Sequence, residues 1–204
     1  MPKEFSPEER RQIRESLIGE GRRLFARYGL KRTGVEELSR AVGIAKGSFY
    51  SFFSSKEDLF MAILEREEEF RGELLEEVYQ QASTAREGIL MLFRRALAFI
   101  ENNDFLQQLY AEETYPQLIR KLGLQRIEAH QHKDEEELAG FVTSLQREGL
   151  ILQEDPKVLV GMFRAMFLLT LHRREIGHEQ FDRVMELTAR VIARGLSTET
   201  GGER

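Results

Sequence analysis

Helix-capping signals recur along the chain of 204 residues, and they constrain its fold more than any other feature. Ser6, Pro7 and Glu9 form a capping box with proline at the first helical position. Apolar residues then recur at helical spacing until Gly29 ends the pattern. Similar starts and stops follow along the chain, and no pair of alternating segments indicates a β-hairpin. The sequence therefore predicts an all-α fold of about nine helices.

Charge divides the chain into two parts. Residues 1–55 carry 11 Lys and Arg against 7 Asp and Glu, a net charge of +4, whereas residues 56–204 carry 19 against 28, a net charge of −9. The overall charge of −5 would by itself argue against a nucleic-acid partner. A small basic segment on an acidic remainder is instead typical of a nucleic-acid module joined to something else. We therefore expect a DNA-binding domain over 1–55 and a second helical domain over 56–204.

Several function classes lack their signatures. The chain has no cysteine, which excludes disulfides, a thiol nucleophile and Cys-ligated zinc. The longest apolar run, Val158–Leu171, is shorter than the roughly 18 residues that a membrane span needs. A helical-bundle iron enzyme needs two Glu-x-x-His motifs, but the chain has one, from Glu175 to His178, at a helix break. His130 and His132 point apart on a helix. We expect no enzyme activity, metal or cofactor, and a cytoplasmic protein without a membrane partner.

Two short helices are predicted on either side of a connection that contains Gly43. This spacing is typical of a helix-turn-helix, whose second helix lies in the DNA major groove. The second helix begins with Lys46, Gly47 and Ser48, which offer a cation, a close backbone approach and a hydroxyl. Tyr50 adds a second hydroxyl. Capped helix pairs also occur in proteins that do not bind DNA, so spacing alone leaves both interpretations open.

Helix starts next to this motif offer further anion sites. The helix expected over about 56–81 begins at Ser55, whose hydroxyl and neighbouring backbone amides can hold a phosphate. Lys56 adds positive charge there. Thr33 can act in the same way at the start of the first short helix. Many helix starts bind only water, so these positions are candidates.

Residues from about Arg10 to Leu64 resemble the N-terminal domain of the TetR family of bacterial transcriptional regulators. The matching stretch is LFARYGLKRTGVEELSRAVGIAKGSFYSFFSSKEDLFMAIL. It contains, in order, Phe25, Gly29, Thr33, Val35, Leu38, Ala41, Gly43, Lys46, Gly47, Phe49, Tyr50, Phe53, Lys56, Glu57 and Leu59. The resemblance implies a three-helix DNA-binding domain in which Lys46, Ser48 and Tyr50 contact DNA. It also implies that Thr33 and Lys56 bind flanking phosphates.

The candidate DNA-binding residues are thus Thr33, Gly34, Lys46, Gly47, Ser48, Tyr50, Ser55 and Lys56. Three positions depart from the family pattern. Gly34 stands where members often carry Ser or Thr, so a helix cap is lost. Phe52 lacks the hydroxyl of the usual tyrosine, and Ser54 replaces a frequent basic residue or glycine. These departures affect individual phosphate contacts.

The resemblance also implies what the whole chain does. We expect a ligand-responsive regulator, most often a repressor, that binds a pseudo-palindromic operator as a homodimer and is released by a small, largely apolar or aromatic effector. A ligand-independent regulator or an activator with the same DNA-binding domain is the alternative, which the sequence does not separate from repression.

The last two helices, expected over about 156–176 and 179–195, are candidates for the dimer interface. Apolar residues surround the first of them, so both of its faces need covering. One face can pack on the protomer's own core and the other on a second copy. A monomer with a fully central helix is the alternative. The expected interface residues are Val158, Met162, Phe181, Met185, Thr188 and Ile192.

Aromatic and methionine side chains are frequent in the second domain. They suit an apolar effector, although side chains at helical spacing also form ordinary cores. The candidate pocket residues are Phe70, Leu74, Val78, Phe93, Leu97, Phe105, Tyr110, Phe141, Phe163, Met166 and Phe167.

Overall fold

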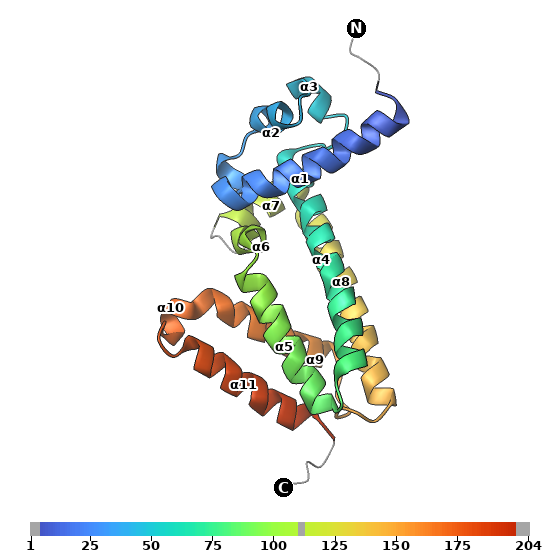
Figure 1. The fold of residues 1–204 in the computed structure, drawn as a ribbon, viewed down its shortest axis with the longest axis vertical. Helices are drawn as coiled ribbons and strands as arrows, with labels where there is room; N and C mark the ends of the chain where they lie inside the picture. The colour runs from blue at the N-terminus through green and yellow to red at the C-terminus, as the bar shows by residue number, and fades with distance from the viewer. Residues whose placement is uncertain (1–4, 110–112, 199–204) are drawn as a thin grey trace. The chain divides into compact units, whose positions relative to one another are not determined.

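The computed structural model describes residues 5–109 and 113–198, with backbone alone at residues 71, 133, 134 and 171, and over these ranges the fold is all-α (Figure 1). The described helices are α1 (Pro7–Arg32), α2 (Val35–Ala41), α3 (Lys46–Phe49), α4 (Lys56–Gln81), α5 (Ala85–Glu101), α6 (Asp104–Leu109), α7 (Thr114–Leu122), α8 (Leu124–Arg147), α9 (Pro156–Leu168), the 3-10 helix η1 (Leu169–His172), α10 (Arg173–Ile176) and α11 (Phe181–Leu196). The predicted fold class is confirmed. There are more helices than expected because α6 forms in an irregular stretch and the apolar helix ends at Leu168, after which η1 and α10 follow.

The first helix begins where its capping box predicts. Ser6 Oγ accepts a hydrogen bond from Glu9 N (3.2 Å), and Ser6 N donates to Glu9 Oε2 (2.8 Å). Regular helical geometry is interrupted at Gly29, where φ is 77°, a left-handed conformation that favours glycine. The helix therefore changes direction at Gly29, and a last short turn ends at Arg32.

The chain packs as two units. The first contains residues up to 70 together with 100–127, and the second contains 71–99 together with residues from 128 onward. This division differs from the expected boundary at residue 55, because 56–70 and 100–127 pack with the N-terminal helices. The assignment of DNA binding to residues 1–55 stays a prediction about function.

Aromatic rings form the core of the first unit. Phe60 of α4 lies between Phe25 of α1 (ring centroids 5.4 Å apart) and Phe105 of α6 (4.6 Å), and all three are fully buried. Helices α1 and α4 approach closely at Gly21, where an added Cβ would lie 2.9 Å from Leu59 Cδ2. These contacts explain why α6, far away in sequence, folds with α1 and α4.

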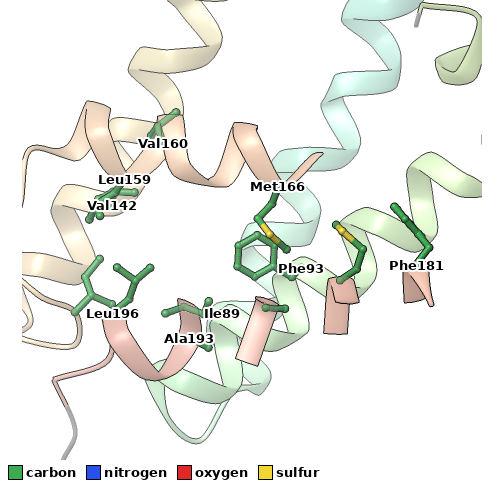
Figure 2. Close-up of a cluster of buried hydrophobic side chains, with 12 residues drawn as sticks. Ile89, Phe93, Val142, Leu159, Val160, Met166, Phe181, Ala193 and Leu196 are labelled. Atoms are coloured by element: carbon green, nitrogen blue, oxygen red, sulfur yellow. The ribbon is translucent and has the colours of Figure 1, made fainter. Parts of the chain in front are cut away.

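The second unit has a core formed by residues of α5, α8, α9 and α11 (Figure 2). Phe93 of α5 is fully buried, with ring centroids 5.1 Å from Phe163 and 6.3 Å from Phe167. Phe181 at the start of α11 also belongs to this cluster. After α11, Leu152 N donates to Leu196 O (2.9 Å), which fastens the end of the helix to the α8–α9 connection.

Candidate nucleic-acid interface

Helices α2 and α3 form a helix-turn-helix beside α1 (Figure 1). The turn contains Gly43, whose φ of 73° requires the conformational freedom of glycine. Ile44 N donates to Ser39 O (3.0 Å), which closes the turn. Leu38 of α2 and Phe49 of α3 are fully buried, so each helix has one apolar side packed inward and one side exposed.

The exposed side of α3 carries the residues that the sequence predicts for DNA contact. Lys46, Gly47 and Tyr50 are exposed, with Tyr50 at 55%, and Ser48 is half-buried. A Cβ on Gly47 would meet no protein atom within 4 Å, so the backbone there is open to a ligand. Gly34 is also exposed, at the start of α2, and makes no side-chain cap. Helix α3 spans only Lys46–Phe49, shorter than the sequence predicts, and a turn continues it.

Thr33 has a structural role in place of the predicted phosphate contact. Its side chain is fully buried, and Oγ1 donates a hydrogen bond to Gly29 O (2.9 Å). The hydroxyl therefore satisfies a carbonyl at the end of α1. Its burial leaves no surface on which a phosphate could bind.

Lys56 also has a structural role, at the junction of α1 and α4. Its ammonium group donates to Leu30 O (2.6 Å), Lys31 O (3.2 Å) and Thr33 O (2.9 Å). A lysine ammonium has three donors, and all three are used here. Burial lowers the pKa of the Lys56 ammonium below its usual value, with a further small lowering from Lys121 and an opposing effect of Glu57. The residue holds the end of α1 to the start of α4, and its predicted phosphate contact stays a prediction.

The start of α4 already contains a carboxylate. Ser55 Oγ accepts a hydrogen bond from Asp58 N (3.1 Å), and Asp58 Oδ2 accepts one from Ser54 N (2.8 Å). Arg126 of α8 pairs with Asp58 Oδ1 at 2.7 Å. Ser55 Oγ is thus already engaged as a helix cap, and its predicted phosphate contact stays a prediction.

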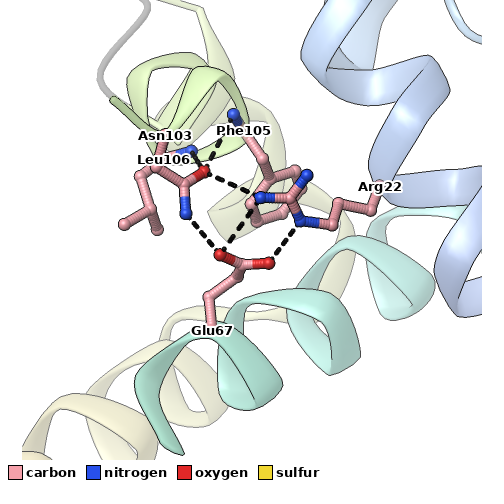
Figure 3. A network of polar contacts seen from close by, with 5 residues as sticks. All are labelled: Arg22, Glu67, Asn103, Phe105 and Leu106. Carbon is pink, nitrogen blue, oxygen red and sulfur yellow. Dashed lines mark hydrogen bonds and ion pairs between the residues drawn. The ribbon is translucent and has the colours of Figure 1, made fainter. Parts of the chain in front are cut away.

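A polar network in the first unit joins α1, α4 and the start of α6 (Figure 3). Arg22 Nε donates to Glu67 Oε1 (2.5 Å), and Asn103 Nδ2 donates to the other oxygen of Glu67. Asn103 Oδ1 accepts hydrogen bonds from Phe105 N and Leu106 N (3.1 Å each) and so caps α6. Sequence reasoning missed this network, although Asn103 directly before Asp104 is a recognisable cap signal.

The predicted effector residues are distributed over both units. Phe93 and Met166 are buried in the core of the second unit, Leu97, Phe163 and Phe167 pack in the same region, Leu74 and Val78 of α4 are buried, and Phe141 is half-buried. Phe70 and Phe105 belong to the first unit, where Phe105 is part of the aromatic core. Tyr110 lies outside the described residues. Phe105 therefore contributes to the folding of the first unit and not to a pocket of the second.

The predicted dimer residues also separate into two groups. Phe181 (2% exposed) and Met185 (3%) lie in the protomer's own core, and Met162 and Ile192 pack against it. Thr188 is half-buried and its Oγ1 donates to Val184 O (2.8 Å). Val158 is exposed. The exposed large apolar residues of α9 and α11 are Val158, Leu168, Val184, Leu187 and Val191.

No group of three or more His, Cys, Asp or Glu residues in the described part of the chain could hold a metal ion. No described helix combines the length and apolar character that crossing a membrane requires.

Comparison with known proteins places the helix-turn-helix in a family. Residues 17–63 match the model described as bacterial regulatory proteins, tetR family. The helix-turn-helix domain of this chain is therefore of the TetR family. A nucleoid occlusion factor, SlmA, of Glaesserella parasuis serovar 5 (strain SH0165) is 41% identical over 66 residues, which are 32% of this chain and 31% of the relative. The HTH-type transcriptional repressor Rv1474c of Mycobacterium tuberculosis (strain ATCC 25618 / H37Rv) is 32% identical over 93 residues, 46% and 45% of the two chains.

This chain matches the SlmA proteins over only about a third of their length, from 31% to 33%. Structural likeness extends further. A structure described as a TetR-family transcriptional regulator from Syntrophomonas wolfei str. Goettingen has a TM-score of 0.71, with 17% identity, over 92% of this chain and 98% of that one. The fold of TetR-family structures thus extends along the chain, whereas the family-model match is limited to residues 17–63. TetR-family regulators bind DNA and are not enzymes, which agrees with the predicted absence of enzyme activity.

Proposed function

We propose that this chain is a cytoplasmic transcriptional regulator that binds a pseudo-palindromic DNA operator as a homodimer. The exposed group of Lys46, Gly47, Ser48 and Tyr50 on α3 is the observation that carries the proposal. A lysine and two hydroxyls beside a glycine can contact phosphates and base edges in the major groove. The buried side of α3 fixes the helix, so these groups are held in place before DNA binds.

Selection from a random-sequence duplex library by the full chain, followed by footprinting, tests DNA binding. The Lys46→Ala and Tyr50→Phe variants are then compared with Lys121→Ala, which removes an exposed lysine from α7. We expect both α3 variants to lose affinity for the selected duplex and Lys121→Ala to keep it. Unchanged affinity in both α3 variants would overturn the assignment of α3 as the recognition helix.

The exposed apolar side of α9 and α11 supports the homodimer. Val184, Leu187 and Val191 of α11 are 38%, 57% and 63% exposed, and they follow one another at helical spacing. Val158 of α9 is 56% exposed. An apolar surface of this kind is stabilised when a second copy covers it, and a two-fold contact presents the same residues from both copies. Such a dimer can place two recognition helices about 34–36 Å apart, one turn of DNA.

Repression released by an apolar effector is the mode of action that we infer. Its support is the Phe93, Phe163, Phe167 and Met166 group in the second unit, since aromatic and methionine side chains suit an apolar or aromatic ligand. To shift nearly all DNA-competent dimers to a state that does not bind DNA, the effector would need to bind that second state more tightly by about 5.5 kcal/mol. Mass spectrometry of the chain purified under native conditions tests the proposal, because a co-purified apolar compound should weaken binding to the selected duplex.

A ligand-independent regulator or an activator with the same DNA-binding domain is the second candidate. The similarity to SlmA and to other curated relatives covers less than half of each chain, and this observation favours the second candidate. Retention of DNA binding in the presence of every extracted compound would favour this candidate over an effector-released repressor.

A further inference from the structure

Two arginines of α1 cover aromatic rings of the segment that follows α3. The Arg10 guanidinium carbon lies 5.0 Å from the centroid of the Phe52 ring, and that of Arg14 lies 5.0 Å from the Phe53 ring. Both distances are within the range of a cation–π interaction. Arg10 also donates from Nη2 to Ser51 O (2.8 Å), so its guanidinium is held by a ring and by a hydrogen bond.

These two guanidinium groups keep their positive charge uncompensated. In the described residues neither of them pairs with a carboxylate, and both side chains are exposed. Neighbouring arginines on the same helix differ in this respect. Arg11 pairs with Glu8 (2.8 Å), and Arg23 pairs with Glu20 (2.7 Å). The first turns of α1 therefore present two guanidinium groups without a carboxylate partner among the described residues, on one side of the helix, since the two residues are four apart.

The position of these charges relates them to the recognition helix. Ser51 and Phe52 follow Tyr50 directly, and Ser51 Oγ donates to Ser48 O (2.7 Å). The ring of Phe5 packs against Phe52 from the segment before α1, with centroids 5.8 Å apart. The Arg10 guanidinium is thus fixed beside the segment that directly follows Tyr50, at the C-terminal end of α3. Less side-chain freedom is lost on binding when a long side chain is already ordered in this way.

We propose that Arg10 and Arg14 form a phosphate-binding site on α1 that extends the DNA-binding surface beyond α2 and α3. The proposal rests on the DNA-binding function proposed above. A planar guanidinium can donate two parallel hydrogen bonds to a phosphate while its face remains on an aromatic ring. Contacts to the DNA backbone position a protein but carry no direct sequence information. The site therefore adds affinity, and a steeper salt dependence, without changing the preferred sequence.

The salt dependence of DNA binding by the full chain tests the site. The probe is a fluorescein-labelled duplex that the wild-type chain has selected from a random-sequence library. We compare Arg10→Gln and Arg14→Gln with Arg23→Gln, which removes the same charge from an ion-paired position of the same helix. Each lost phosphate contact should lower the slope of log affinity against log salt by about 0.9. We expect this decrease per bound protomer in both α1 variants, an unchanged slope in Arg23→Gln, and the same selected sequence for all.

Two results would overturn the site. The first is an unchanged slope of log affinity against log salt in both Arg10→Gln and Arg14→Gln, equal to the slopes of the wild type and of Arg23→Gln. This result would show that α1 binds no phosphate. If the wild-type chain selects no DNA at all, the proposed function fails and the site fails with it. Circular dichroism establishes that each variant is folded. The Arg14→Lys variant, which keeps the charge, should retain the wild-type slope, and its failure to do so would point to a packing role for Arg14.

Discussion

The ammonium nitrogen of Lys56 lies 2.6 Å from the carbonyl oxygen of Leu30, and this contact joins the start of α4 to the end of α1. Carbonyl oxygens at a helix end carry partial negative charge, so a cation there is stabilising. The same ammonium group also contacts two neighbouring carbonyls. A residue whose sequence position suggests a DNA contact therefore stabilises the DNA-binding domain itself.

Replacement of Lys56 by methionine, which keeps the apolar part of the side chain, should lower the free energy of unfolding. We expect a loss of about 1–2 kcal/mol, because three carbonyl contacts to a charged but only partly buried group are removed. Urea unfolding followed by circular dichroism measures it. Lys31→Met is the control, since it breaks an exposed pair with Glu113 and should cause no measurable loss. If the Lys56→Met variant keeps its stability but shows a smaller slope of log DNA affinity against log salt, Lys56 instead contacts a DNA phosphate.

Asp58 should make the free energy of unfolding depend on pH in the acid range. Burial acts to raise the pKa of its carboxyl, but hydrogen bonds from Ser54 and Arg126 outweigh burial and leave the pKa below its usual value. Because the folded pKa lies below the unfolded one, Asp58 contributes stability above about pH 3.9 and loses it as the pH falls through the folded pKa. Asp58→Asn should be less stable than the wild type at neutral pH, and the difference should shrink in acid.

Urea midpoints measured over this pH range test the prediction for Asp58. The Asp182→Asn variant is the control, because its carboxylate is 81% exposed and pairs with Arg173 at the surface. A stability difference between Asp58→Asn and the wild type that stays constant from neutral pH into strong acid would contradict the assigned role.

Two glycines of α1 should respond in opposite ways to alanine. A Cβ at Gly21 would lie 2.9 Å from Leu59 Cδ2 and 3.1 Å from Ile63 Cδ1, so these buried side chains or the helices must shift, and overpacking should cost about 1–3 kcal/mol. At Gly19 a Cβ would meet nothing within 4 Å, and alanine should stabilise the helix by up to about 1 kcal/mol. Urea unfolding of the two variants measures both effects. Equal stability changes would show that α1 and α4 are not closely packed at Gly21.

Charge on the exposed side of α11 should weaken dimerisation. Leu187 is 57% exposed, so Leu187→Glu should leave the protomer folded but place carboxylates from both copies in the proposed contact. Sedimentation velocity should show a shift from dimer to monomer, with weaker binding to the selected duplex. Leu124→Glu is the matched control, because Leu124 is 51% exposed but lies at the start of α8 in the first unit. Dimers of equal strength in both variants would exclude this side of α11 as the interface.

Local signals in the sequence predicted the helices well. The capping box of Ser6 and Glu9 and the positive φ of Gly29 depend on residues within one helical turn, so their chemistry is visible in the sequence. The exposed residues of α3 could be predicted for the same reason. Leu38 and Phe49 are large apolar residues that pack inward from the two short helices, so Lys46 and Tyr50 are left on the outside.

Contacts between distant segments could not be predicted in this way. The structural roles of Lys56 and Thr33 were hidden because nothing local shows that the carbonyls at the end of α1 turn toward them. The burial of Phe181 and Met185 was also hidden. Helix α11 has apolar residues on two sides, and only the packed cluster shows which side faces the protomer's core.

The packing of Phe105 against Phe60 has a consequence for protein engineering. Exchange of sensory domains between related regulators is most simply designed as a single cut between the recognition helix and the rest of the chain. In this protein such a cut would remove residues 100–127 and uncover the rings that they protect. A chimera that keeps this DNA specificity must therefore transplant two separate pieces of sequence, and replace only the residues before and after the second piece.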